Sequence, residues 1–163
     1  MRRQGRAHVL PDDVDTDQII PGEYLTTVSD DELGNYVLVG YDETFPDRVE
    51  DGDIVVAGSN FGLGSSRESA PVALKKGGIG AVVAESFARI FYRNAINVGL
   101  PIAAVPDITD HVDDGDAVSV DIEAGLVTNE TSGAAFDVEP LPPDLLAILE
   151  AGGLVAYRQA KAE

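Results

Sequence analysis

The stretch of sequence with the clearest chemical potential runs from Gly58 to Gly78 and reads GSNFGLGSSRESAPVALKKGG. It follows an apolar run, Asp53 to Ala57, that is typical of a buried strand, and it leads into a helical pattern. A glycine loop between a strand and a helix lets the backbone approach a ligand closely, and a helix N-terminus favours negative charge. Arg67 adds a forked cation that suits a carboxylate or a phosphate. The pattern indicates an anion site, while an ordinary strand–helix turn with serine caps is the alternative.

The loop matches neither of two common phosphate-binding motifs. It lacks the Gly-Lys-Ser/Thr ending of a P-loop, and Arg67 stands where the third glycine of a dinucleotide fingerprint would be. The two hydroxyls, arginine and acid from Ser65 to Glu68 suit a small carboxylate better. Ser66 or Ser69 is predicted to cap the following helix.

Three segments of the chain together carry a family resemblance: DTDQIIP at residues 15–21, GSSRE at residues 64–68, and SFARIFYRNAIN at residues 86–97. In their order and spacing they closely resemble the small subunits of 3-isopropylmalate dehydratase, which are swivel domains of the aconitase superfamily. The resemblance extends over nearly the whole chain. It implies a hydro-lyase subunit that isomerises 2-isopropylmalate to 3-isopropylmalate in leucine biosynthesis. Small subunits of citramalate, dimethylmalate or homoaconitase-type dehydratases are close alternatives.

The resemblance also assigns site residues by position. The first serine of the Ser-Ser-Arg motif, Ser65, would abstract the proton, and Ser66 and Arg67 would hold the substrate carboxylates. Thr16 and Asp17 would lie at the rim of the site, with Asp17 supporting catalysis. The sequence departs from the family at one place, because Ser69 follows Glu68 where a histidine is usual. In this interpretation Ser69 replaces the histidine by capping, or the substrate differs.

The resemblance also implies that a short loop, Tyr24-Leu25-Thr26, contacts the variable group of the substrate and so determines specificity. Homoaconitase-like relatives tend to have arginine at its third position, where it would pair with a distal carboxylate. Thr26 is short and uncharged, which favours a small and mostly apolar group such as isopropyl, or the methyl of citramalate. A buried carboxylate without its cation costs on the order of 3–5 kcal/mol, more than the ~1–3 kcal/mol of one misfitted methylene.

The cofactor implied by the resemblance would belong to another chain. The family's large subunit carries a [4Fe–4S] cluster, and this chain has no cysteine with which to bind one. We therefore expect a large-subunit partner, a small 2-hydroxy acid substrate and no metal on this chain. A carboxylate-binding module without enzymatic activity remains the rival hypothesis, because the same serine and arginine would serve it.

Composition excludes several other classes of function. The net charge is −18 with only three lysines, so neither nucleic acid nor an anionic membrane is an expected partner. The Lys-poor, Asp-rich composition suggests a halophilic protein, with an acidic soluble protein as the simpler alternative. No apolar run approaches the ~20 residues of a membrane span, and no apolar segment follows the basic start as in a signal peptide. A cytoplasmic location is expected.

The elements that must position these residues alternate between strand and helix. The alternation predicts one α/β domain over residues 1–163 with parallel crossovers. The resemblance implies that this domain is a three-layer β/β/α swivelling domain with a mixed, largely parallel central sheet. A capping box is predicted to open a helix at Ser29, residues 116–122 read as a half-exposed strand, and Asp144–Glu150 reads as the final helix. His8 and His111 lie outside the motifs and are expected to be structural or exposed.

Overall fold

The computed structural model describes residues 1–162. Its elements follow the chain in this order: β1 (Arg2–Val9), α1 (Thr16–Ile19), α2 (Tyr24–Thr27), the 3-10 helix η1 (Asp30–Tyr36), α3 (Phe45–Arg48), β2 (Asp53–Ala57), α4 (Ser69–Lys76), β3 (Ile79–Ala84), α5 (Arg89–Val98), β4 (Ile102–Ala104), the 3-10 helix η2 (Ile108–Asp110), β5 (Ala117–Asp121), β6 (Leu126–Asn129), β7 (Ala135–Asp137), α6 (Pro143–Glu150) and α7 (Leu154–Ala162).

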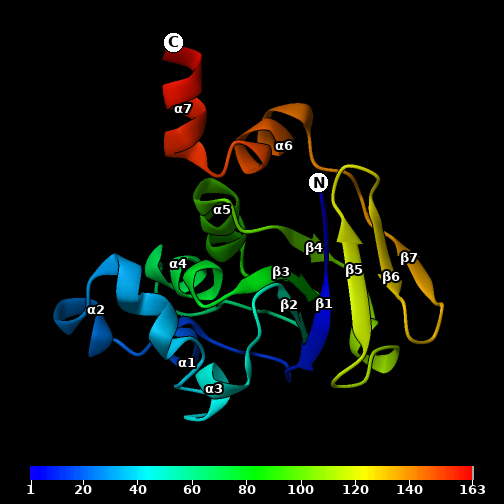
Figure 1. Ribbon diagram of the computed structural model, residues 1–163, viewed down its shortest axis with the longest axis horizontal. Coiled ribbons are helices and arrows are strands. Elements are labelled where there is room, and N and C mark those ends of the chain that lie inside the picture. Colours follow the sequence, from blue (N-terminus) through cyan, green and yellow to red (C-terminus); the bar gives the residue numbers. More distant parts are fainter. Residues whose placement is uncertain (163) are drawn as a thin grey trace.

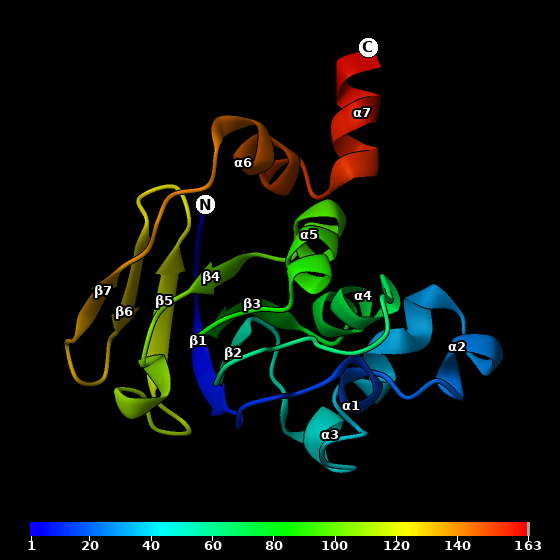
Figure 2. The ribbon, with the colours of Figure 1, turned by 180° about the vertical axis from the view of Figure 1, so that it is seen from behind.

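The strands and helices form three layers, as predicted (Figure 1). The seven strands follow the order β4-β3-β2-β1-β5-β6-β7. The ladders from β4 to β1 are parallel, and those from β1 to β7 are antiparallel. Helices α4 and α5 cover the parallel strands on one side, and β5 to β7 lie on the other (Figures 1 and 2). The mixed β/β/α architecture is therefore confirmed.

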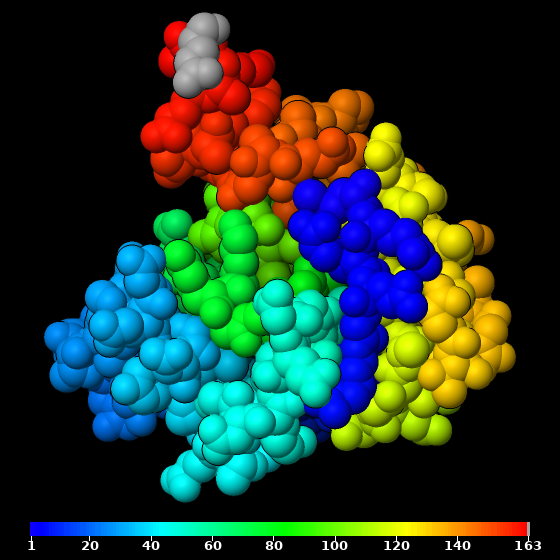
Figure 3. Space-filling view, in the orientation of Figure 1, coloured from blue at the N-terminus to red at the C-terminus, as the bar shows by residue number. Residues whose placement is uncertain are grey.

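Strand β1 belongs to both halves of the sheet. Residues 2–6 pair with β5 in antiparallel fashion, and residues 7–9 pair with β2 in parallel. Gly5 lies just before this change, and a Cβ there would overlap the carbonyl oxygen of Gly52. Glycine therefore lets two backbones approach where β1 changes partners. The blue N-terminal strand lies at the surface between the cyan and yellow segments (Figure 3).

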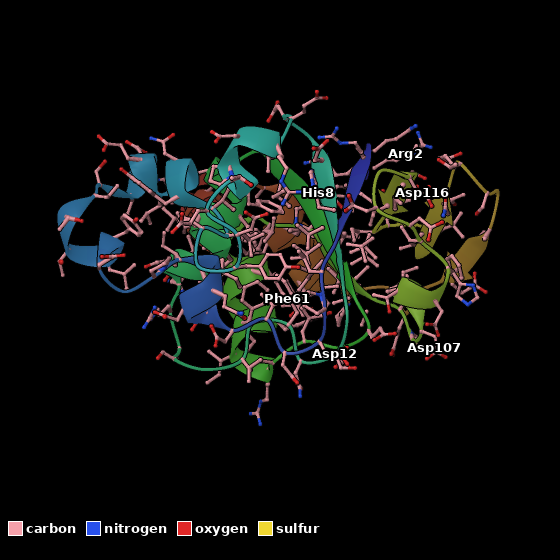
Figure 4. The ribbon with its side chains drawn as sticks, turned by 90° about the horizontal axis from the view of Figure 1, so that it is seen from below. Arg2, His8, Asp12, Phe61, Asp107 and Asp116 are labelled. Carbon is pink, nitrogen blue, oxygen red and sulfur yellow. The ribbon has the colours of Figure 1, made fainter. Side chains whose placement is uncertain are left out.

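Alternate side chains of β2 enter two different cores, since successive residues of a strand point to opposite faces. Val55 and Ala57 face the helices, in a cluster that includes Leu74 and Phe91. Ile54 and Val56 face the antiparallel strands, in a cluster that includes residues of β5 and β6. This two-sided burial explains why β2 is apolar from Ile54 to Ala57. Phe61, at the centre of Figure 4, belongs to the helix-side core and is fully buried.

His8 is structural, as the sequence suggested. Its Nε2 lies 2.7 Å from Oδ2 of Asp53, and both side chains are buried. Burial of Asp53 opposes its ionisation. A hydrogen bond from the backbone N–H of Glu50, the hydrogen bond and charge of His8, and the charge of Arg6 outweigh burial and lower the pKa of Asp53. The pair joins β1 to β2, and the imidazole ring of His8 packs against Phe45 with ring centres 5.0 Å apart.

Two predicted helix caps are wrong. Ser29 makes no side-chain cap hydrogen bond, because the turns after it are 3-10 and the Glu32 N–H bonds to the Ser29 carbonyl. The capping box lies instead at the start of α1, where Asp15 accepts from the Gln18 N–H at 2.7 Å and the Gln18 side chain accepts in return. Helix α4 also lacks a serine cap, because Glu68 is its N-cap residue and Ser69 is its first helical residue.

The C-terminal part of the chain differs from prediction in two ways. The centre of β5 is buried on both faces, not half-exposed as predicted. The buried Ser119 hydroxyl donates a hydrogen bond to the Glu130 carboxylate, which also pairs with Arg2. The chain continues beyond Gly152 and Gly153 into α7, so α6 is not the final helix. Helix α7 has no buried residue, which explains why its sequence lacks a helical core pattern. It projects from the body beside α6 (Figure 1).

Candidate active site

The glycine loop after β2 is held in place by the segments before α1 and before α5. Gly62 donates a backbone hydrogen bond to Val14 at 2.7 Å, and Thr16 donates to Leu63 at 2.9 Å. The Asp12 carboxylate accepts from the Ser59 N–H at 2.8 Å. The acidic turn that contains Asp12 thus anchors the loop. These bonds fix the backbone that leads to the Ser-Ser-Arg motif.

Gly62 brings the loop directly against helix α5. Its φ is +86°, a conformation that side chains rarely adopt, and a Cβ there would overlap the ring of Phe91. Phe91 is almost fully buried and packs edge-on against Phe61 at 5.3 Å between ring centres. The glycine therefore determines how closely the loop and the start of α5 approach each other.

A cleft of about 410 Å³ lies between the loop and the N-terminal half of α5. It is lined by Thr16, Gly62, Gly64, Ser65, Ser66, Arg67, Ala88, Arg89, Ile90, Phe91, Arg93 and Asn94. Ser65 and Ser66 are exposed, and the backbone N–H groups from Ser65 to Glu68 have no acceptor within residues 1–162. These free donors lie next to the N-terminus of α4, as the predicted anion site requires.

Arg67 is held by partners on α1 and just after it. Its Nη1 donates to the Ile20 carbonyl at 3.1 Å and lies 3.4 Å from Oδ1 of Asp17. The Asp17 oxygen also accepts from the backbone N–H of Gly22. The side chain of Arg67 is 22% exposed and that of Asp17 is 68% exposed. Asp17 does not line the cleft itself, so its contact with the site passes through Arg67.

The predicted specificity loop lies apart from this cleft. Tyr24, Leu25 and Thr26 belong to α2, and none of them lines the cleft. Tyr24 stacks on Tyr36 with ring centres 4.2 Å apart, and Thr26 is exposed. The link between loop and cleft is the base of the loop, where Gly22 lies beside the Arg67 guanidinium.

Sequence reasoning did not assign Arg89 and Arg93 to the site. Both are exposed and line the cleft beside the serines. Their spacing of four residues places both arginines on one face of a helix, and this spacing is the feature of the sequence that could have indicated a shared cationic surface. What the sequence could not show is that this face meets the glycine loop.

The structure offers neither a metal centre nor a membrane-spanning helix in the part of the chain that it describes. Among residues 1–162, no group of three or more histidine, cysteine, aspartate or glutamate side chains could hold a metal ion. No helix in the same part of the chain is long and apolar enough to cross a membrane.

The three layers and the serine–arginine cleft define the chain as a swivel domain of the aconitase type. The family model described as the aconitase C-terminal domain matches residues 21–105, slightly more than half of the chain. The chain belongs to this family, and within it to the small subunits of 3-isopropylmalate dehydratase and related enzymes, which confirms the resemblance seen in the sequence.

Two curated relatives and one solved structure show how near the match is. The 3-isopropylmalate dehydratase small subunit 1 of Methanopyrus kandleri is 55% identical over 93% of this chain and 89% of its own length. The methanogen homoaconitase small subunit of Methanothermobacter thermautotrophicus is also 55% identical, over 94% of this chain and 89% of its own. The crystal structure titled 3-isopropylmalate dehydratase (leuD) from Methanocaldococcus jannaschii has a TM-score of 0.93 at 48% identity, covering 99% and 96% of the two chains.

Proposed function

We propose that this chain is the small subunit of a hydro-lyase that isomerises 2-isopropylmalate to 3-isopropylmalate, with a cluster-bearing large subunit as its partner. The observation that carries the proposal is the cleft in which Ser65 and Ser66 lie exposed beside Arg67, in a chain of this family. In this proposal residues 1–163 act as one swivel domain in the cytoplasm.

Ser65 is the proposed base that removes the proton from the substrate carbon. A serine hydroxyl is a poor base in water, so the site must stabilise an alkoxide. Free N–H groups of the loop, the N-terminus of α4 and the Arg67 guanidinium all provide positive potential at this place. A dry interface with the large subunit would strengthen each of these interactions.

Ser66 and Arg67 are the proposed contacts to the substrate carboxylates. The Ile20 carbonyl and Asp17 hold one guanidinium nitrogen of Arg67, which leaves the rest of the fork for a ligand. Asp17 is thus a positioning residue rather than a group that meets the substrate.

The residues of this chain do not fit an iron–sulfur cluster. The chain has no cysteine, and no alternative ligand cluster exists within residues 1–162. We place the [4Fe–4S] cluster in the large subunit and assign no step of its chemistry to the residues described here.

Two relatives that are equally identical to this chain are named for enzymes with different substrates, so overall identity does not choose the substrate. The proposed choice therefore rests on Thr26. A short uncharged side chain favours isopropylmalate, or citramalate or dimethylmalate, over homocitrate. The loop lies outside the cleft of this chain alone, so this proposal requires that the large subunit or a movement of α2 brings them together.

The experiment that tests the function combines the chain with its large subunit. The chain alone, freed of metal, should be inactive, and the pair should show its highest kcat/KM with isopropylmalate. Thr26→Arg should shift kcat/KM toward homocitrate by roughly tenfold or more, since the arginine would pair with the distal carboxylate. Thr27→Arg, which adds the same charge one residue later, is the matched control.

Three results would contradict these proposals. Activity of the isolated chain would remove the need for a partner. A pair that binds carboxylates without turnover would support the rival binding module. A preference for homocitrate before mutation, or no gain in Thr26→Arg, would show that this loop does not select the substrate.

The acidic composition supports a further proposal, that the protein is adapted to high salt. At a net charge of −18, self-repulsion should destabilise the fold in dilute buffer, and added ions should screen it. The melting temperature is expected to rise from dilute buffer to molar KCl. A melting temperature that is unchanged or lower in KCl would reject the adaptation to high salt and favour the simpler alternative of an acidic protein.

A further inference from the structure

Helix α5 exposes an apolar side chain between two arginines at the cleft. Arg89, Ile90 and Arg93 all line it, and Ile90 is 54% exposed. Four large apolar side chains are exposed within residues 1–162, and Ile90 is the one that lines this cleft. An exposed isoleucine at the mouth of a site gains free energy when another surface covers it.

The charge of the cleft is opposite to that of the chain. The chain has 29 acidic residues and 11 lysines and arginines, yet the cleft lining has three arginines and no acidic residue. Arg67 pairs with Asp17, whereas Arg89 and Arg93 have no ion pair within residues 1–162. Like charges four residues apart on a helix repel each other and destabilise it. Carboxylates from outside the chain would remove this repulsion.

We propose that Arg89, Ile90 and Arg93 form the surface onto which the large subunit docks. The partner surface would carry carboxylates opposite the two arginines and an apolar recess for Ile90. This inference rests on the proposed function, because it takes the large subunit as the partner.

The geometry favours a protein partner over the substrate at these residues. Arg67, the proposed substrate contact, is mostly buried and held by two partners, as suits recognition of a small carboxylate. Arg89 and Arg93 are exposed and flank an apolar side chain, from which a small dianion gains nothing. An apolar anchor with arginine around it is the composition of an interface hot spot. On a chain of net charge −18, this patch is also where a surface bearing carboxylates meets least repulsion.

The test measures binding of the full chain to the cluster-bearing large subunit. The variants are the double substitution Arg89→Gln with Arg93→Gln, and Ile90→Ser. Their matched controls are Arg158→Gln and Val155→Ser on α7, where Arg158 is exposed and Val155 is 71% exposed. Each test variant should raise Kd about tenfold or more, and each control should stay within about twofold. Circular dichroism melts check that every variant is folded.

A second measurement separates docking from substrate binding. Association of the unsubstituted chain should slow as salt is added, and the double arginine variant should lose most of this dependence. An unchanged Kd with a raised KM, measured with the large subunit in excess, would overturn the inference and assign the arginines to the substrate. Unchanged Kd and KM would also overturn it. An unsubstituted chain that does not bind the large subunit would refute the proposed function itself.

Discussion

Replacement of Ser65 by alanine should slow turnover of the reconstituted enzyme by roughly 10²–10⁴-fold, as the loss of a positioned base does. Ser65 is exposed in the cleft beside Arg67, and its side chain has no hydrogen-bond partner within residues 1–162 to reorganise. The binding groups therefore remain in place, and KM should change little. The measurement is kcat and KM for isopropylmalate with the large subunit in excess.

Ser66→Ala is the matched comparison, because it removes the same hydroxyl from the adjacent residue. We expect it to raise KM with a smaller loss of kcat, since Ser66 is the proposed carboxylate contact. Full turnover in Ser65→Ala would show that another residue is the catalytic base. Equal loss of kcat in both variants would show that the two hydroxyls act as one unit.

Replacement of Gly62 by alanine should lower the free energy of unfolding by about 2–5 kcal/mol. About 1–2 kcal/mol comes from the positive φ, and about 1–3 kcal/mol from overlap with the packed ring of Phe91. Gly62 has φ +86° and faces this ring directly, so either the loop or α5 must move. The measurement is chemical denaturation of the isolated chain, with reconstituted activity as a second readout.

Gly133→Ala separates the two contributions. Gly133 has φ +85°, almost the same as Gly62, but nothing lies within 4 Å of a Cβ there. It should therefore lose only the conformational part, about 1–2 kcal/mol. If Gly62→Ala is no more destabilising than Gly133→Ala, the contact with Phe91 does not limit the approach of loop and helix.

The sequence by itself determined the features that contiguous residues encode. The run from Ile54 to Ala57 requires a buried strand, and the glycines with Ser65, Ser66 and Arg67 require an open loop with a cation. Local chemistry of this kind depends on neighbours in the chain, so the loop was predictable from its own residues. The layered fold was predictable because the three segments that carry the family resemblance are contiguous stretches of sequence. The caps at Ser29 and Ser69 were not predictable. The turns after Ser29 are 3-10 turns that its side chain does not cap, and α4 begins at Ser69 itself, so that Glu68 is the N-cap residue.

Only the tertiary structure decided which distant residues share the cleft. Thr16, the serine loop and Arg89 come from three separate segments, and they meet because Gly62 lets the loop contact Phe91. Helical spacing placed Arg89 and Arg93 on one face but could not show which element that face meets. The same packing gives Asp17 its contact with Arg67 and leaves Tyr24 stacked on Tyr36, away from the cleft. Such contacts depend on how closely separate backbones approach, which the local pattern of a sequence does not contain.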